Sequence, residues 1–262
     1  MTTRRAARRA ASDRRRAYDH RVFDADEVDY SQPVALFPLA SVALMPHALQ
    51  ALHVFEPRYR RMTEDALGDA DPPDLQEAAP IAMATFAGTS WREDYAGTPP
   101  LRPVVCVGRI VRHRRLPDGR HDLVLHGVAR ARILAMHEPG GDRPYRMAEL
   151  VPLERPHAPR PPMPGVRSAF EEMLARPRLG RVEGMQQALE WFRRPEMPTH
   201  AAVEVAGHVL VRDPELRYRM LSEADPVRRA SLLRDAVAGI ERMVALAERQ
   251  GSDAWPRGES WN

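Results

Sequence analysis

The chain has 262 residues, of which 44% are hydrophobic and 29% charged, and its formal net charge at pH 7 is +3. This length predicts one or two domains, and this composition allows a hydrophobic core. The sequence contains no lysine, so all 39 of its lysine-or-arginine positions are arginine. It therefore excludes three classes of enzyme that require a lysine side chain: P-loop nucleotidases, serine–lysine peptidases and enzymes that form a Schiff base.

Signals for targeting and redox compartment point to the cytoplasm. No apolar run reaches the length of about 18 residues that a membrane-spanning helix needs, so we expect no membrane contact. The arginine-rich amino terminus lacks the apolar segment of a secretory signal. Cys106 is the one cysteine of the chain, which excludes an internal disulfide and fits a reducing compartment.

Residues 1–31 are predicted to form a disordered arm. Residues 1–21 carry eight arginines against Asp13 and Asp19, and a short acidic run follows. Such a segment has too few apolar groups to join a core. A solvated tail is the favoured interpretation. An electrostatic arm that binds nucleic acid or another anionic surface is the alternative, and an organelle transit peptide is a third option.

Residues 32–154 are predicted to be rich in strands. Short apolar runs broken by prolines predict strands at 34–37, 42–45 and 49–55. One helix is expected inside this region, because Pro57 suits a first helical position and Gly68 suits a helix end. The turn Leu116-Pro117-Asp118-Gly119 predicts a hairpin. The remaining predicted strands cover residues 81–86, 104–115, 121–127, 128–136 and 145–153.

The pattern changes after residue 154. Residues 155–164 contain five prolines and predict a stiff linker. Residues 165–250 then show helical periodicity, and Asp213-Pro214 and Asp225-Pro226 each predict a helix start, with an aspartate cap before a proline. Residues 251–262 are expected to form a flexible tail that carries Trp255 and Trp261.

Two stretches carry a resemblance to a known family. The first has Pro38, Pro46 and the motif Phe55-Glu56-Pro57-Arg58-Tyr59; the second has Gly108, Leu125, Gly127 and Arg130. They resemble the amino-terminal, substrate-binding domain of Lon proteases, which also occurs as free-standing proteins and in cereblon. The resemblance implies an α+β fold, with a PUA-like, mostly antiparallel β pseudo-barrel followed by a carboxyl-terminal helical bundle. It also implies a domain that captures substrate and does no chemistry itself.

The motif residues are expected to act mainly as scaffold. Glu56 should lie beside the first turn of its helix, where a carboxylate is favoured, Arg58 should pair with it or brace a neighbouring strand, and Tyr59 should pack inward. Binding is expected instead from apolar side chains without an evident core role, because exposed aromatic side chains are frequent binding hot spots. These candidates are Trp91, ranked first, then Met45, Phe86 and Tyr95.

No pattern of residues predicts a catalytic site, a metal site or a cofactor. The ten histidines form no His-Glu-x-x-His motif, and no Gly-x-Ser-x-Gly elbow occurs. Cys106 lies in an apolar run and is expected to be a buried, inert thiol. His53 is expected to be a core residue, since it lies on an apolar strand.

Three functions remain open at this point. The first is a non-enzymatic module that binds unfolded or degron-bearing polypeptides and passes them to a separate protease. The second is an RNA-binding module that uses the PUA-like barrel and residues 1–21. The third is an adaptor that joins a larger assembly through its helices.

Overall fold

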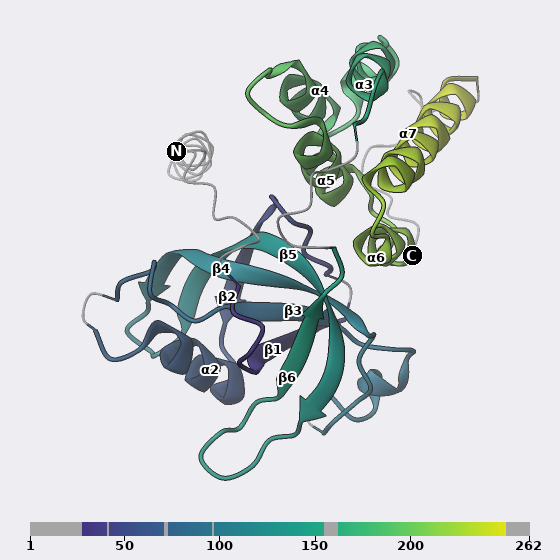
Figure 1. Ribbon diagram of the computed structural model, residues 1–262. Coiled ribbons are helices and arrows are strands. Elements are labelled where there is room, and N and C mark those ends of the chain that lie inside the picture. Colours follow the sequence, from purple (N-terminus) through teal and green to yellow (C-terminus); the bar gives the residue numbers. More distant parts are fainter. Residues whose placement is uncertain (1–27, 41, 71–72, 96, 155–161, 250–262) are drawn as a thin grey trace, which may run out of the picture.

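The computed structural model describes residues 28–40, 42–70, 73–95, 97–154 and 162–249. These residues form a strand-rich unit and a group of helices that follows it in the chain (Figure 1). Most of the predicted arm and linker, and the whole predicted tail with its two tryptophans, lie outside the described residues. The predicted division of the chain into an arm, a strand-rich domain, a linker, a helical part and a tail therefore stays a prediction.

Among the described residues, all the strands and one α-helix come first in the chain, and the other α-helices follow. The strands are β1 (Val34–Leu39), β2 (Leu49–Val54), β3 (Ile81–Thr85), β4 (Val104–Arg115), β5 (His121–His137) and β6 (Met147–Pro152). The helices are α2 (Pro57–Leu67), α3 (Val166–Leu174), α4 (Met185–Arg193), α5 (Thr199–Leu210), α6 (Pro214–Ser222) and α7 (Pro226–Arg249). In the part of the chain that the structure describes, no helix is long and apolar enough to cross a membrane.

Five of the strands close into a ring. β5 pairs with β4, β4 with β3, β3 with β1, β1 with β6, and β6 again with β5. Only the β1–β3 pair is parallel among the described strands. β5 has 17 residues, which lets its first part pair with β2 and its last part with β6. The predicted α+β fold, a mostly antiparallel barrel-like sheet followed by helices, is confirmed.

Three of the predicted strands differ from the observed ones. Residues 42–45 form no strand; Leu44 and Met45 are fully buried, so this run is apolar because it packs in the core and not because it joins the ladder. Residues 121–127 and 128–136 form one strand, which passes through Gly127 without a break. A Cβ atom at Gly127 would lie 2.2 Å from the Met45 carbonyl oxygen, so only glycine lets these two segments meet.

Alternate residues of the strands face two hydrophobic clusters, as the two-residue period of a strand requires. One cluster contains mostly small side chains, among them Ala82 and Val105. The other contains Met83 and Cys106 and continues into α2 and the helices of the carboxyl-terminal part. The second cluster therefore joins the sheet to the helices.

The starts of α6 and α7 are set by local sequence. The Asp213 carboxylate accepts hydrogen bonds from the Glu215 and Leu216 N–H groups at 3.2 and 3.1 Å. The Asp225 carboxylate accepts one from the Val227 N–H at 2.9 Å. Both predicted helix starts are confirmed, because each aspartate satisfies N–H groups that a helix leaves unpaired.

A buried ionic network connects the barrel to the helices. Arg130 of β5 pairs with Glu204 of α5, and with Glu154, which follows β6, at 3.1 Å. Arg229 of α7 pairs with the same two carboxylates, at 2.6 Å for Glu204 and 2.8 Å for Glu154. The side chains of Arg130, Glu204 and Arg229 are each 2% exposed. Two positive and two negative groups thus neutralise one another, and only Glu154, whose side chain is 29% exposed, reaches water.

Backbone carbonyls complete this network. The Arg130 Nε donates to the Leu221 carbonyl at 3.0 Å, and the Arg229 Nη1 donates to the Glu223 carbonyl at 2.7 Å. Burial alone would lower the pKa of Arg130, but Glu204 and Glu154 outweigh it and hold that pKa above its usual value. Burial lowers the pKa of Arg229. Each guanidinium therefore has several partners, as a buried charge requires; the Arg229 Nε meets Glu204 as an ion pair without the geometry of a hydrogen bond.

We expect Glu204→Gln to lower the free energy of unfolding by about 3–5 kcal/mol, because it leaves buried guanidinium groups without a compensating charge. Urea unfolding followed by circular dichroism measures this loss. Glu183→Gln is the matched control, since the Glu183 and Arg212 side chains are 90% and 70% exposed. The control should change the free energy by less than about 1 kcal/mol. Equal losses in the two variants would contradict the role given to the network.

His208 of α5 predicts a dependence of stability on pH. Burial, with a smaller effect of Arg217, lowers its pKa to about 4, whereas an unfolded histidine titrates near 6.5. The unfolded state therefore binds a proton first as the pH falls. The stability from neutral His208 is complete above about pH 6.5 and is lost between that pH and about 4, by about 3 kcal/mol. In His208→Gln, the free energy of unfolding should depend less on pH across this range, as urea unfolding at several pH values measures. An unchanged pH dependence would refute the role given to His208.

Candidate functional site

The pairing between β1 and β6 stops soon after the start of β1, and this leaves an opening in the ring. Only the first two residues of β1 pair with β6, and the Leu36 N–H then donates to the Arg146 carbonyl at 2.9 Å. Two residues further on, Pro38 faces the same edge, because alternate residues of a strand share an edge. Proline has no N–H to donate, so it ends the ladder. The two segments separate from this point.

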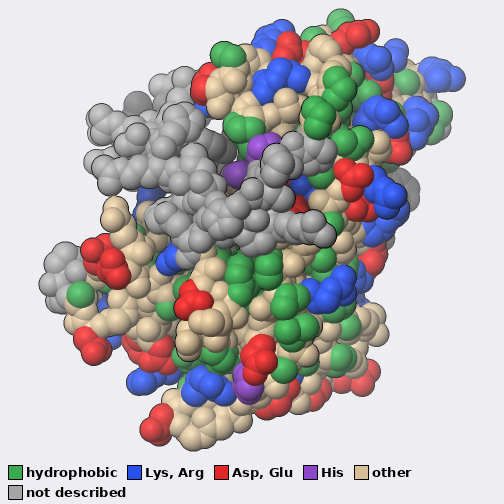
Figure 2. Space-filling view, viewed as in Figure 1, with side chains coloured by type: hydrophobic (Ala, Val, Ile, Leu, Met, Phe, Trp, Pro, Cys, Tyr) green, Lys and Arg blue, Asp and Glu red, His purple; other side chains and the backbone are tan. Residues whose placement is uncertain are grey.

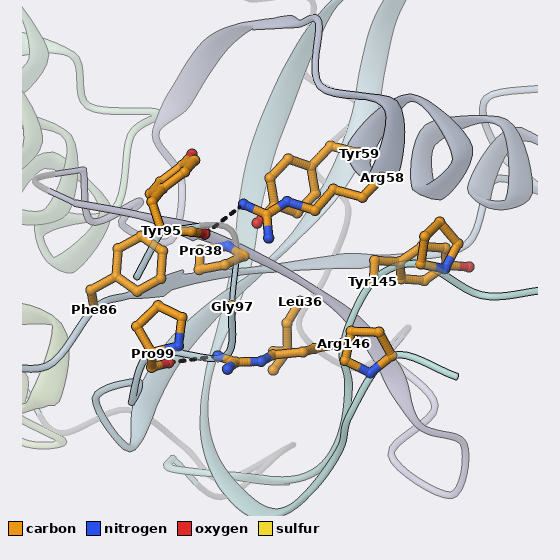
Figure 3. A pocket seen from close by; sticks show the side chains of 12 residues that line it. Leu36, Pro38, Arg58, Tyr59, Phe86, Tyr95, Gly97, Pro99, Tyr145 and Arg146 are labelled. Carbon is orange, nitrogen blue, oxygen red and sulfur yellow. Dashed lines mark hydrogen bonds between the residues drawn. The ribbon is translucent and has the colours of Figure 1, made fainter. Parts of the chain in front are cut away.

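A narrow pocket occupies this opening (Figure 3). Its volume is about 20 Å³, which is room for about one water molecule. The walls come from β1, the start of α2, the segment between β3 and β4, and the connection from β5 to β6. The lining residues are Leu36, Pro38, Arg58, Tyr59, Phe86, Tyr95, Gly97, Pro99, Pro139, Pro144, Tyr145 and Arg146.

The Glu56–Arg58 corner holds one wall of the pocket. The Arg58 Nε donates to the Glu56 carboxylate at 3.1 Å, and its Nη2 donates to the Tyr95 carbonyl at 3.1 Å. The Tyr95 hydroxyl donates to the other Glu56 oxygen at 2.7 Å. The Arg58 guanidinium also lies over the rings of Tyr59 and Tyr95, at 4.7 and 5.2 Å from their centroids. These contacts fasten the segment between β3 and β4 to the start of α2.

Three aromatic rings form a cluster beside the pocket. The Phe86 ring stacks on Trp91 with centroids 5.7 Å apart and meets the Tyr95 ring edge-on at 5.8 Å. Trp91 and Tyr95 are 6.4 Å apart. Phe86 is buried, whereas Trp91 and Tyr95 are partly exposed, and Arg92 lies over the Trp91 ring. The cluster thus has an inner anchor and an outer face of two rings.

Arg146 and Tyr145 fix the opposite wall. The Arg146 Nη1 donates to the Pro99 carbonyl at 2.7 Å, and its Nε donates to Glu138 at 2.9 Å. The Tyr145 hydroxyl donates to Asp65 of α2 at 2.8 Å. Burial, followed by this hydrogen bond, raises the pKa of Tyr145 to about 12. Both guanidinium groups of the pocket are therefore paired with carboxylates, and the wall is neutral.

The structure brings together several of the residues that the sequence singled out. Pro38, Arg58, Tyr59, Phe86 and Tyr95 all line the pocket, with Trp91 in contact with two of them. Pro46, Gly108, Gly127 and Arg130 lie elsewhere, in the barrel and its junction with the helices.

Four expectations about single residues differ from the structure. Met45 is 0% exposed, so the expectation that it lacks a core role is wrong; it lies where the chain crosses Gly127. Phe86 is 4% exposed and can reach a ligand only through the pocket. Phe55 is not packed scaffold but 59% exposed. His53 is not a core residue: its side chain is 45% exposed and its Nδ1 lies 2.7 Å from Asp122.

Sequence reasoning missed the wall formed by Pro99, Tyr145 and Arg146. The available signal was the Arg-Pro-Tyr-Arg run directly before β6, where aromatic and guanidinium groups follow a proline. This run forms a pocket wall only because the β5–β6 connection folds back on β1, and no local sequence pattern predicts that contact.

The described residues that line the pocket include no carboxylate, imidazole or thiol. Cys106 is fully buried, and burial raises the pKa of its thiol, so it is inert as expected. Within the described residues, no group of three or more His, Cys, Asp or Glu side chains is placed to hold a metal ion. The partly exposed rings of Trp91 and Tyr95 beside the pocket, rather than the pocket itself, suit non-covalent contact with apolar groups.

Comparisons with known proteins agree with a binding domain of this architecture. The family model of the ATP-dependent protease La (LON) substrate-binding domain matches residues 33–238. The chain therefore belongs to this family. Among curated proteins, no sequence matches the chain significantly.

Two solved structures have a similar fold. The crystal structure of a Lon N-terminal domain protein from Xanthomonas campestris aligns with a TM-score of 0.53 at 21% identity, covering 78% of this chain and 98% of that one. The N-terminal domain of a Mycobacterium avium complex Lon protease aligns with a TM-score of 0.56 at 16% identity, covering 79% of this chain and 98% of that one.

We expect Tyr95→Phe to loosen the segment that carries Trp91, because it removes the hydrogen bond to Glu56 that fastens this segment. Limited digestion with trypsin should cleave after the exposed Arg92 several-fold faster in this variant. Tyr145→Phe is the matched control, since it removes a tyrosine–carboxylate bond from the opposite wall. If both variants are cleaved at the wild-type rate, the Glu56 bond does not hold the segment.

Proposed function

We propose that this protein binds segments of other polypeptides without catalysing a reaction on them. The observation that carries this proposal is the aromatic cluster, in which Trp91 and Tyr95 present partly exposed rings and Phe86 and Arg58 hold them in place. Rigid aromatic side chains supply large contact areas at a small cost in conformational entropy. Membership of the LON substrate-binding family supports the same function.

The ligand that fits this surface best is an exposed apolar segment, as found in an unfolded or degron-bearing polypeptide. Hydrophobic side chains are also visible on the face of the strand-rich unit that Figure 2 presents. The guanidinium groups of Arg58 and Arg146 are already paired with carboxylates, which limits the positive charge that the surface offers to an anionic ligand. A separate protease or a larger assembly, in the cytoplasm, would receive the bound polypeptide.

Two other functions, RNA binding and an adaptor role, remain predictions. RNA binding is predicted through the PUA-like barrel together with residues 1–21, and these residues lie outside the described part of the chain. Its mark would be affinity that falls steeply with salt and is lost when these residues are deleted. An adaptor function through the helices would be recognised by co-purification of a stable assembly.

We expect Trp91→Ala to weaken binding of an unfolded polypeptide about 10-fold or more, as truncation of an aromatic hot spot does. Fluorescence anisotropy with labelled, reduced and carboxymethylated lactalbumin, which cannot refold, measures the affinity. Met243→Ala is the matched control, because Met243 is 73% exposed on α7, outside the cluster.

The control should bind like the wild type. Wild-type affinity no greater than for folded lactalbumin would refute the proposed function. Wild-type affinity in Trp91→Ala would refute the aromatic cluster as the binding surface.

A further inference from the structure

The strand β2 has one free edge. β5 is its only pairing partner among the described strands, whereas β1, β3, β4 and β6 each take part in the closed ring. A strand edge presents N–H and C=O groups whose natural partner is another extended backbone.

The hydrogen bonds identify which residues face this edge. The Gly127 N–H donates to the Ala48 carbonyl at 2.9 Å, so Ala48 faces β5. Alternate residues share an edge, so Leu49, Ala51 and His53 face away from β5. In agreement, the Ala51 carbonyl accepts a hydrogen bond from the Gln50 side-chain amide at 2.9 Å. Apart from bonds within the β2–β5 ladder, no backbone hydrogen bond joins residues 49–54 to the rest of the described chain.

Apart from the Gln50 side chain, which bonds the Ala51 carbonyl, this edge lacks the features that usually protect one. Natural edge strands are blocked by prolines, charged side chains, bulges or covering elements. β2 reads Leu-Gln-Ala-Leu-His-Val, with no proline, arginine or carboxylate, and its pairing with β5 is regular over all six residues. An unprotected edge of this kind either binds a strand or promotes aggregation.

The free edge leads directly to the aromatic cluster. Ala51 and His53 are exposed on one face of β2, and Phe55 continues that row two residues on, with its ring stacked on His53 at 6.2 Å. The next residue, Glu56, accepts the hydrogen bond from Tyr95. A chain lying along β2 would therefore pass Phe55 and arrive at the surface formed by Tyr95 and Trp91.

We propose that β2 receives an extended segment of the bound polypeptide as an additional strand of the sheet. This inference rests on the proposed function and specifies its ligand: an unfolded segment of alternating apolar residues, read through its backbone. Main-chain hydrogen bonds to Leu49, Ala51 and His53 would supply affinity without regard to sequence. Phe55 and the aromatic cluster would supply the preference for apolar side chains.

Ala51→Pro tests this geometry. Proline at residue 51 removes an N–H from the free edge while leaving the bonds to β5 in place, and Ala51→Ser keeps the N–H with a side chain of similar size. With the labelled, carboxymethylated lactalbumin, we expect affinity at least 10-fold weaker for the proline variant and unchanged for the serine variant.

Amide hydrogen exchange of the wild type supplies a second readout that needs no variant. The Ala51 and His53 amides should exchange more slowly once lactalbumin is added, while the Leu52 amide, already bonded to β5, should not change. This measurement decides the case if the proline variant fails to fold.

The outcomes separate the two proposals. Wild-type affinity in Ala51→Pro, or Ala51 and His53 amides that stay unprotected at saturation, overturns strand addition and leaves polypeptide binding intact. No binding by the wild type overturns both. A dimer of the wild type that Ala51→Pro converts to monomer, with amides already protected before lactalbumin is added, assigns the edge to a second copy of the chain and overturns the proposal.

Discussion

The four-residue network of Arg130, Glu204, Arg229 and Glu154 is the constraint on which the rest of the structure depends. Its members come from β5, α5, α7 and the end of the strand-rich unit. Removing these charges from water is costly, and the cost is recovered only when all the partners meet in good geometry. A displacement of the helices relative to the barrel would leave a guanidinium unpaired, so the network permits one arrangement where hydrophobic contact alone would permit several.

This arrangement also decides which parts of the barrel stay accessible. Figure 1 shows the helical unit on one side of the barrel, with α2 and the β5–β6 connection on the other. The pocket is lined by residues of α2 and of that connection, so the helices do not cover it. The stabilising network and the proposed binding surface therefore lie on different sides, and arginine side chains take part in both. At Arg130 it is fully desolvated; at Arg58 it lies over two aromatic rings.

The sequence predicted those features that depend on neighbouring residues. The starts of α2, α6 and α7 follow from a proline at the first position, with an aspartate cap in the last two, and the hairpin between β4 and β5 follows from Pro117 and Gly119. The predictions that failed were those that inferred burial or exposure of a side chain from the apolar run around it. Met45 is apolar because it is buried in a crossing segment, and His53 lies on an apolar strand yet faces solvent. Residues distant in sequence decide both outcomes, so local patterns could not.

The pocket and the free edge are two different exceptions to the closed pairing of the ring, and no local sequence pattern reveals either of them. A closed ring satisfies its strands on both sides, so an opening must be made by a residue that cannot pair or by a strand outside the ring. Pro38 makes the first kind of opening and β2 the second. They flank the corner from Phe55 to Tyr59, whose Glu56 and Arg58 hold the intervening aromatic segment in place. The hydrogen bonds of the corner therefore have a structural role, and through them the corner also positions the surfaces on either side of it.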